Sequence, residues 1–84
     1  MEAKEFFARM ISNDDMQAVI NCNPLPEIEV KEQEVRQAYR SLPALQRCVV
    51  KKRMRRYHSA FSGIQKPEIR RQFAMLTQIL QIIV

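Results

Sequence analysis

A run of cations, KKRMRR at residues 51–56, is the feature of this sequence with the clearest chemical meaning. Five of its six residues are positively charged, and Tyr57 and His58 follow directly. Cations at this density suit phosphates, because each contact with a polyanion releases condensed counterions. Three interpretations are open: a surface for nucleic acid, a surface for an acidic protein, or the solvated side of an ordinary helix.

Charge is divided unequally between the two halves of the chain. Residues 1–42 hold five Lys and Arg against eight Asp and Glu, a net charge of −3. Residues 43–84 hold nine against one, a net charge of +8. Because so many like charges repel one another, we expect either an external polyanion or the chain's own acidic half to neutralise them. The candidate internal partners are Glu27, Glu29, Glu32 and Glu34.

Residues that commonly catalyse reactions or bind metals are few and dispersed. His58 is the only histidine, and Cys48 lies ten positions away, about 15 Å along a helix, too far for a Cys–His pair. Asp14 and Asp15 suit the first turn of a helix better than an acid–base pair. One glycine leaves no glycine-rich loop for a nucleotide. We therefore expect a protein that is not an enzyme and has no metal, cofactor or small-molecule substrate.

Composition favours a single intracellular domain spanning residues 1–84. The sequence is 46% hydrophobic and 27% charged, which is typical of globular proteins. Its two cysteines lack CxxC spacing and suit a reducing compartment. The apolar stretch at 73–84 is interrupted by polar residues and is too short for a membrane span. MEAKEFFARM lacks the apolar core of a signal peptide. We expect a cytoplasmic location and no membrane partner.

Apolar residues at helical spacing predict an all-α fold, a compact bundle of about five helices, two of them short. The expected ranges are 2–11, about 14–21, about 28–41, 43–62 and 67–82. Residues 27–31 are ambiguous, because Ile28 and Val30 alternate as they would in a strand.

Three residues predict where the fourth helix starts and stops. Ser41 and Pro43 are typical of a helix N-terminus. Gly63 is expected to end the helix in the left-handed conformation that glycine adopts readily.

The predicted helix 43–62 changes its apolar face half-way along. Its first half is apolar at Leu45, Cys48 and Val49. Its second half has a stripe offset by about 150°, formed by Val50, Met54, Tyr57 and Phe61. We therefore expect the helix to contact two different neighbours or to bend.

The cations of this helix form a separate row with His58, at Arg47, Lys51, Arg55 and His58. We also expect the first turn of the last helix to extend the cationic surface. The candidate nucleic-acid-binding residues are Arg47, Lys51, Lys52, Arg53, Arg55, Arg56, Arg70 and Arg71.

The last predicted helix is apolar around about 200° of its circumference, where one buried face needs about 100°. It should therefore be buried on two sides. Either it is the central element of the core, or it forms the seam of a homodimer or a dock for another protein. The candidate interface residues are Phe73, Leu76, Ile79, Leu80, Ile82 and Ile83.

Two functions fit these features. The first is a small basic regulator that binds DNA or RNA through phosphate contacts, as a homodimer; the last helix offers few side chains that could read base edges. The alternative is a protein–protein interaction module, such as an adaptor, an inhibitor or a redirecting factor of phage or mobile-element type. It would dock on a larger protein through the basic surface and the apolar C-terminal helix.

Overall fold

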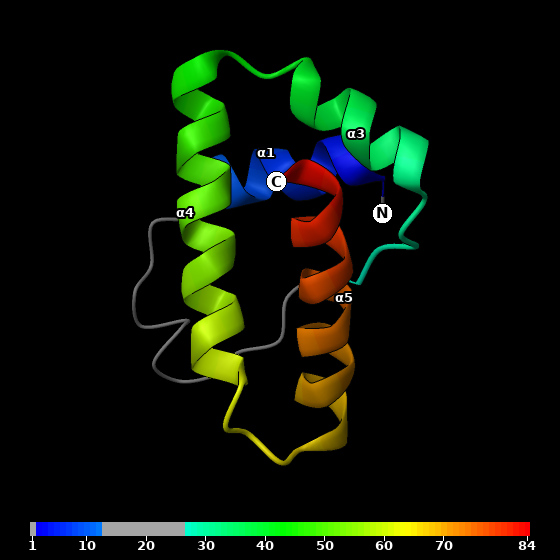
Figure 1. Ribbon diagram of the computed structural model, residues 1–84, viewed down its shortest axis with the longest axis vertical. Coiled ribbons are helices and arrows are strands. Elements are labelled where there is room, and N and C mark those ends of the chain that lie inside the picture. The colour runs from blue at the N-terminus through cyan, green and yellow to red at the C-terminus, as the bar shows by residue number, and fades with distance from the viewer. Residues whose placement is uncertain (1, 13–26) are drawn as a thin grey trace.

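Four α-helices make up the described part of the protein (Figure 1), a computed structural model that describes residues 2–12 and 27–84. They are α1 (Ala3–Ser12), α3 (Glu32–Arg40), α4 (Ala44–Phe61) and α5 (Pro67–Ile83), and these residues form no strand. The Cα radius of gyration is 11.9 Å, close to the ~12 Å of a compact chain of this length. The prediction of a compact all-α fold is confirmed. The expected helix at about 14–21 lies outside the described residues.

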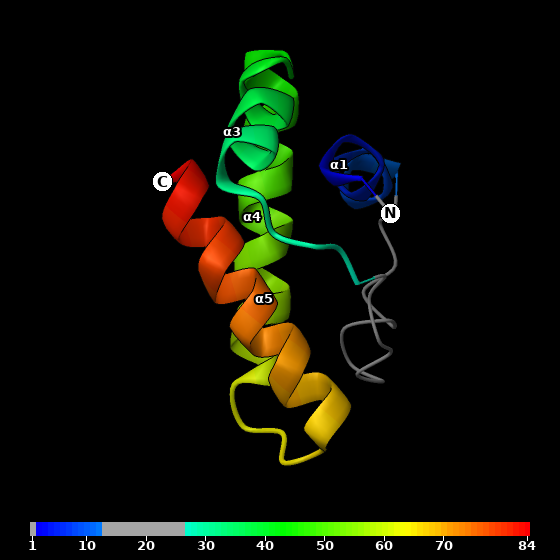
Figure 2. The same ribbon diagram turned by 90° about the vertical axis from the view of Figure 1, so that its right-hand side faces the viewer.

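The two long helices, α4 and α5, lie side by side and antiparallel (Figure 1). Helix α1 crosses behind them, and α3 packs on both α1 and α5. Figure 2 shows α1 on the side away from the C-terminal end of α5. Helix α4 therefore has α5 along one side and α1 across another.

The core forms where the apolar faces of the four helices meet. Phe6 and Phe7 of α1 are fully buried, and the ring of Phe7 contacts Tyr39 of α3 edge-on, with centroids 6.1 Å apart. Leu76 and Ile79 of α5 are equally buried. Helix α4 contributes the stripe predicted from its spacing, Val50, Met54, Tyr57 and Phe61.

Helices α4 and α5 begin close to where the sequence predicts. The predicted role of Ser41 is wrong, however, because Ser41 ends α3, where its hydroxyl donates to the carbonyl of Gln37 at 2.8 Å. Pro43 precedes the first residue of α4, and Pro67 opens α5 after the extended residue Lys66. Proline suits these positions because a helix N-terminus has no acceptor for its N–H groups. Within the described residues, no helix is both long and apolar enough to cross a membrane.

The third helix begins later than predicted. Helix α3 starts at Glu32 instead of residue 28, and Lys31 is extended, with φ −105° and ψ 115°. Ile28 is buried and Val30 half-buried, whereas Glu27 and Glu29 are exposed. Residues 27–31 are therefore not helical, and their alternating burial fits the extended alternative although they form no strand.

The expectation that Gly63 is left-handed is wrong. Its φ lies outside the positive range, and Ser62 before it is right-handed, with φ −60°. The Ser62 hydroxyl donates to the carbonyl of Ser59 (2.7 Å), and the Ile64 N–H donates to that of Phe61 (3.1 Å). Because these bonds satisfy two carbonyls at the helix end, no left-handed residue is needed.

The first half of α4 also departs from expectation. Leu45 is 83% exposed and Cys48 is exposed, so their stripe is not covered by a neighbouring helix. The first turns of α4 extend past the level at which α1 crosses (Figure 1). The helix is therefore anchored by its second stripe.

Truncating two leucines tests this packing. Leu76→Ala should lower the free energy of unfolding by about 2–5 kcal/mol, because it leaves a cavity in the core. Leu45→Ala removes the same atoms from an exposed position and should change it by less than about 0.5 kcal/mol. Urea denaturation followed by circular dichroism measures both, and equal losses would contradict the packing.

Candidate functional site

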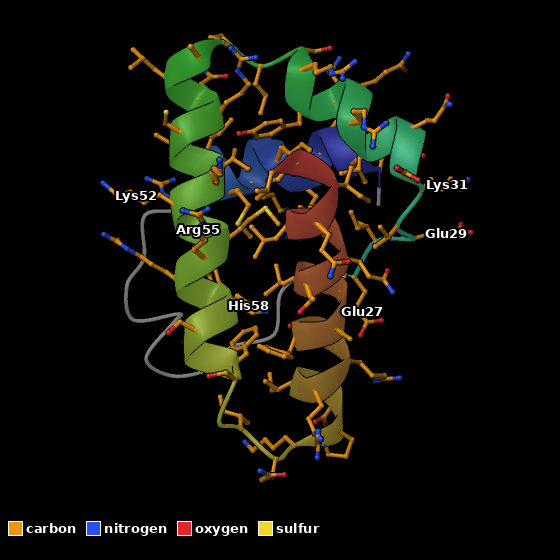
Figure 3. The ribbon with its side chains drawn as sticks, in the orientation of Figure 1. Glu27, Glu29, Lys31, Lys52, Arg55 and His58 are labelled. Carbon is orange, nitrogen blue, oxygen red and sulfur yellow. The ribbon has the colours of Figure 1, made fainter. Side chains whose placement is uncertain are left out.

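One face of α4 is turned to solvent and concentrates positive charge. Six residues border an open depression of about 580 Å³ on this face, which we call the basic face: Cys48, Lys51, Lys52, Arg55, Arg56 and Ser59. At 100° per residue they fall within about 140° of the circumference. Lys52 extends from α4 away from α5 (Figure 3). Four of the six are cations, so a ligand in this depression would meet mainly ammonium and guanidinium groups.

The acidic segment at residues 27–34 forms no ion pair with three cations of this face. Within the described residues, Lys51, Lys52 and Arg55 form no ion pair with a carboxylate. Glu29 and Glu32 lie near other cations of their own segment, with N–O distances of 3.8 Å to Lys31 and 2.7 Å to Arg36. The prediction that residues 27–34 neutralise the basic run is therefore wrong for Lys51, Lys52 and Arg55.

Negative charge gathers on the other side of the molecule. Glu27, Glu29 and Lys31 lie across α5 from Lys52 in Figure 3. Four glutamates and one lysine border a depression of about 380 Å³: Glu2, Glu5, Glu29, Lys31 and Glu34. The starts of α1 and α3 and the residues just before them thus have an acidic side that is separated from the basic face.

Like charges on the basic face lie close enough to repel one another. Lys51 and Arg55 are four positions apart, as are Lys52 and Arg56. Each such pair lowers helix stability by about 0.2–0.5 kcal/mol. A ligand that carries negative charge would relieve this repulsion.

Arg53 makes a different contact from the other cations of the run. Its side chain is half-buried, and Nη1 donates to the backbone carbonyls of Met10 and Ile11 in the last turn of α1. A cation is favourable there, because the carbonyl end of a helix carries partial negative charge. Arg53 therefore joins α4 to α1.

The remaining predicted cations do not border the basic face. Arg47 is half-buried, and its carbonyl accepts a hydrogen bond from the Tyr39 hydroxyl at 3.4 Å. Arg70 donates to the side chain of Gln65 at 3.2 Å. Arg71 borders a separate depression of about 270 Å³ together with Glu27. The structure thus brings four of the eight candidates together: Lys51, Lys52, Arg55 and Arg56.

His58 faces α5 and does not border the basic face. Its ring stacks on Phe73, with centroids 4.2 Å apart and an angle of 18°. Its Nε2 lies 2.8 Å from the hydroxyl oxygen of Thr77, which itself donates to the Phe73 carbonyl at 2.9 Å. With its one hydrogen directed to Phe73, the Thr77 hydroxyl accepts from His58 in the tautomer that carries a proton on Nε2. The contact joins α4 to α5, although the sequence placed His58 in the cationic row.

The candidate interface residues of α5 divide into two groups. Leu76 and Ile79 are fully buried within the chain. The other four are half-buried, and Val84 beyond them is 73% exposed: Phe73, Leu80, Ile82 and Ile83. Helix α5 is therefore part of the core and also leaves apolar surface near its C-terminal end.

Sequence reasoning missed Cys48 and Ser59 as members of the basic face. Their spacing could have identified them, because positions 48, 52, 55 and 59 recur at helical intervals and therefore lie on one face of a helix. Across residues 2–12 and 27–84, no three His, Cys, Asp or Glu side chains are grouped as metal ligands would be.

The chain matches no known protein family, curated protein or solved structure. The basic face must therefore be interpreted from its own residues.

Two arginines on α4 should respond differently to truncation. Arg53→Ala should lower the free energy of unfolding by about 1–2 kcal/mol, because two α1 carbonyls lose a charged donor. Arg55→Ala should leave it within about 0.5 kcal/mol, or raise it slightly, by relieving repulsion with Lys51. Chemical denaturation of both variants makes the comparison, and a larger loss for Arg55→Ala would refute these roles.

Proposed function

We propose that this protein is a small, basic, non-enzymatic regulator that binds nucleic acid through the basic face of α4. The observation that carries the proposal is the set of exposed or half-exposed cations on one helix face. Within the described residues, three of them, Lys51, Lys52 and Arg55, pair with no carboxylate. A polyanion supplies the missing charge at many closely spaced positions, which an isolated acidic residue does not.

Each type of residue on the basic face suits phosphate in its own way. Arg55 and Arg56 offer planar guanidinium groups that can donate two parallel hydrogen bonds to one phosphate. Lys51 and Lys52 act as point charges, and the Ser59 hydroxyl can donate to a phosphate oxygen. Such contacts fix position without reading sequence, so binding should be weakly sequence-dependent. Dissociation constants for this kind of binding fall around 10⁻⁴–10⁻⁶ M at physiological salt.

We further propose that the protein acts as a homodimer through the C-terminal end of α5. Leu80, Ile82 and Ile83 are half-buried and Val84 is 73% exposed, which leaves apolar surface that a second copy could cover. A two-fold axis would present two basic faces to one nucleic acid and double the number of phosphate contacts.

One observation favours the alternative function, a protein–protein interaction module. Leu45 is 83% exposed and lies one turn before Cys48, at the end of the basic face. An apolar anchor beside cations suits an acidic protein surface better than a phosphate backbone. The complex should then survive nuclease treatment in a pull-down, whereas a nucleic-acid complex should be lost.

The salt dependence of binding tests the main proposal. If four phosphates are contacted, the logarithm of the association constant should fall against the logarithm of salt concentration with a slope of about −3.6 per protomer on duplex DNA. Replacing Lys52 and Arg55 together by alanine should weaken binding and reduce the slope by about 2. Fluorescence anisotropy with labelled oligonucleotides measures both quantities.

A matched control separates the basic face from net charge. Lys4→Ala combined with Arg40→Ala also removes two exposed cations, but from α1 and α3. This variant should keep the slope of the wild type. Equal losses in the two double variants would mean that net charge, and not the basic face, is responsible for binding.

The mass of the protein in solution tests the dimer. Light scattering should give twice the chain mass of 9.9 kDa. Replacing Leu80 and Ile83 by aspartate should yield a monomer that keeps its helical circular dichroism, because these side chains are only half-buried. A monomeric wild type would remove the dimer from the proposal and leave the basic face unaffected.

A further inference from the structure

Every aromatic side chain of this chain contacts another ring of the fold. The sequence has four Phe, two Tyr and no Trp, and all six aromatic residues fall within the described ranges. Four of them are buried, with 4% exposure or less: Phe6, Phe7, Tyr57 and Phe61. Tyr57, which directly follows the cationic run, thus points into the core, where its ring contacts that of Phe61 with centroids 5.7 Å apart.

The two half-buried aromatics are also occupied. The ring of Tyr39 lies against Phe7, and its hydroxyl donates to the carbonyl of Arg47. One face of Phe73 is covered by the imidazole of His58. The basic face itself therefore contains no aromatic ring, because none of its six residues is aromatic.

Exposed aromatics matter for single strands more than for duplexes. Proteins that bind single-stranded nucleic acid stack the bases on aromatic rings, and each base contributes about 1–3 kcal/mol. A single strand is also flexible, so binding must offset the entropy of ordering it. Without stacking, only phosphate contacts remain to offset this loss of entropy.

The spacing of the cations fits the denser charge of a duplex. The four cations of the basic face lie within about 7.5 Å along the helix axis. A duplex presents one phosphate charge per ~1.7 Å of its axis, whereas one strand presents one per ~3.4 Å. The duplex therefore offers more phosphates to this short cationic surface, and it is already ordered.

From these observations we infer that the ligand of the basic face is double-stranded nucleic acid, recognised through its phosphates, and not single-stranded nucleic acid recognised through its bases. This inference rests on the proposed function and narrows its substrate class.

Competition among ligands of one length tests the inference. The full-length protein is titrated with labelled duplex DNA, duplex RNA and the separate strands of each at low salt. At least one duplex should bind about tenfold more tightly than its single strands. Unlabelled inorganic polyphosphate should displace the bound duplex. Base composition should have little effect, and tyrosine fluorescence, corrected for absorption by the nucleic acid, should not change.

A charge-conserving variant distinguishes phosphate contact from stacking of a guanidinium group on a base. Arg55→Lys keeps the charge but loses the planar group. It should retain duplex affinity within about threefold, whereas Arg55→Ala should lose roughly one unit of salt slope. The inference would be overturned if Arg55→Lys lost as much affinity as Arg55→Ala and if binding of single strands weakened most. That result would show that the guanidinium group stacks on bases.

The failure of the inference is distinguishable from the failure of the proposed function. If single strands bind as tightly as the duplexes or more tightly, the protein still binds nucleic acid, but the inference is wrong. If no nucleic acid binds at low salt, the proposed function is wrong and the inference falls with it.

Discussion

The packing of one stripe of α4 against the core determines the rest of the structure. Val50, Met54, Tyr57 and Phe61 are buried, and each such side chain contributes about 1.5–3 kcal/mol when withdrawn from water. Arg53 and His58 lie on opposite edges of this stripe, one bonded to α1 and the other to Thr77 of α5. These two contacts help to fix the rotation of the helix, and the opposite side, with its cations, must face solvent.

This burial explains how the chain tolerates a basic face that destabilises its own helix. The like-charge pairs Lys51–Arg55 and Lys52–Arg56 oppose helix formation by a few tenths of a kcal/mol each. Burial of Met54 or Phe61 outweighs both pairs together. Because packing of the buried stripe supplies the stability, the residues on the solvent-facing side of α4 can serve a role other than folding. Arg53, by contrast, belongs to the interactions that maintain the fold, because it bonds to the α1 carbonyls.

The sequence predicts periodic features well and contacts between distant segments poorly. Residues 50, 54, 57 and 61 recur at helical spacing, so the buried stripe of α4 follows from local geometry. Arg53 and Arg55 are chemically identical and two positions apart, and only the position of the α1 C-terminus makes one a structural contact. The role of His58 likewise depends on α5. The start of α3 was misplaced because residues 27–31 carry both a helical and an alternating pattern, and burial of Ile28 decided between them.

The separation of basic from acidic residues, more than the net charge, determines which side of the molecule attracts an anionic ligand. The molecule measures 33 × 24 × 21 Å, whereas electrostatic screening at physiological salt acts over about 8 Å. A ligand near one side therefore responds to that side and not to the net charge of +5. Phosphates are attracted by α4 and repelled by the glutamates that border the depression on α1 and α3. An anionic ligand is therefore attracted to the α4 side, and the six residues that border the depression there include four cations and no aromatic ring.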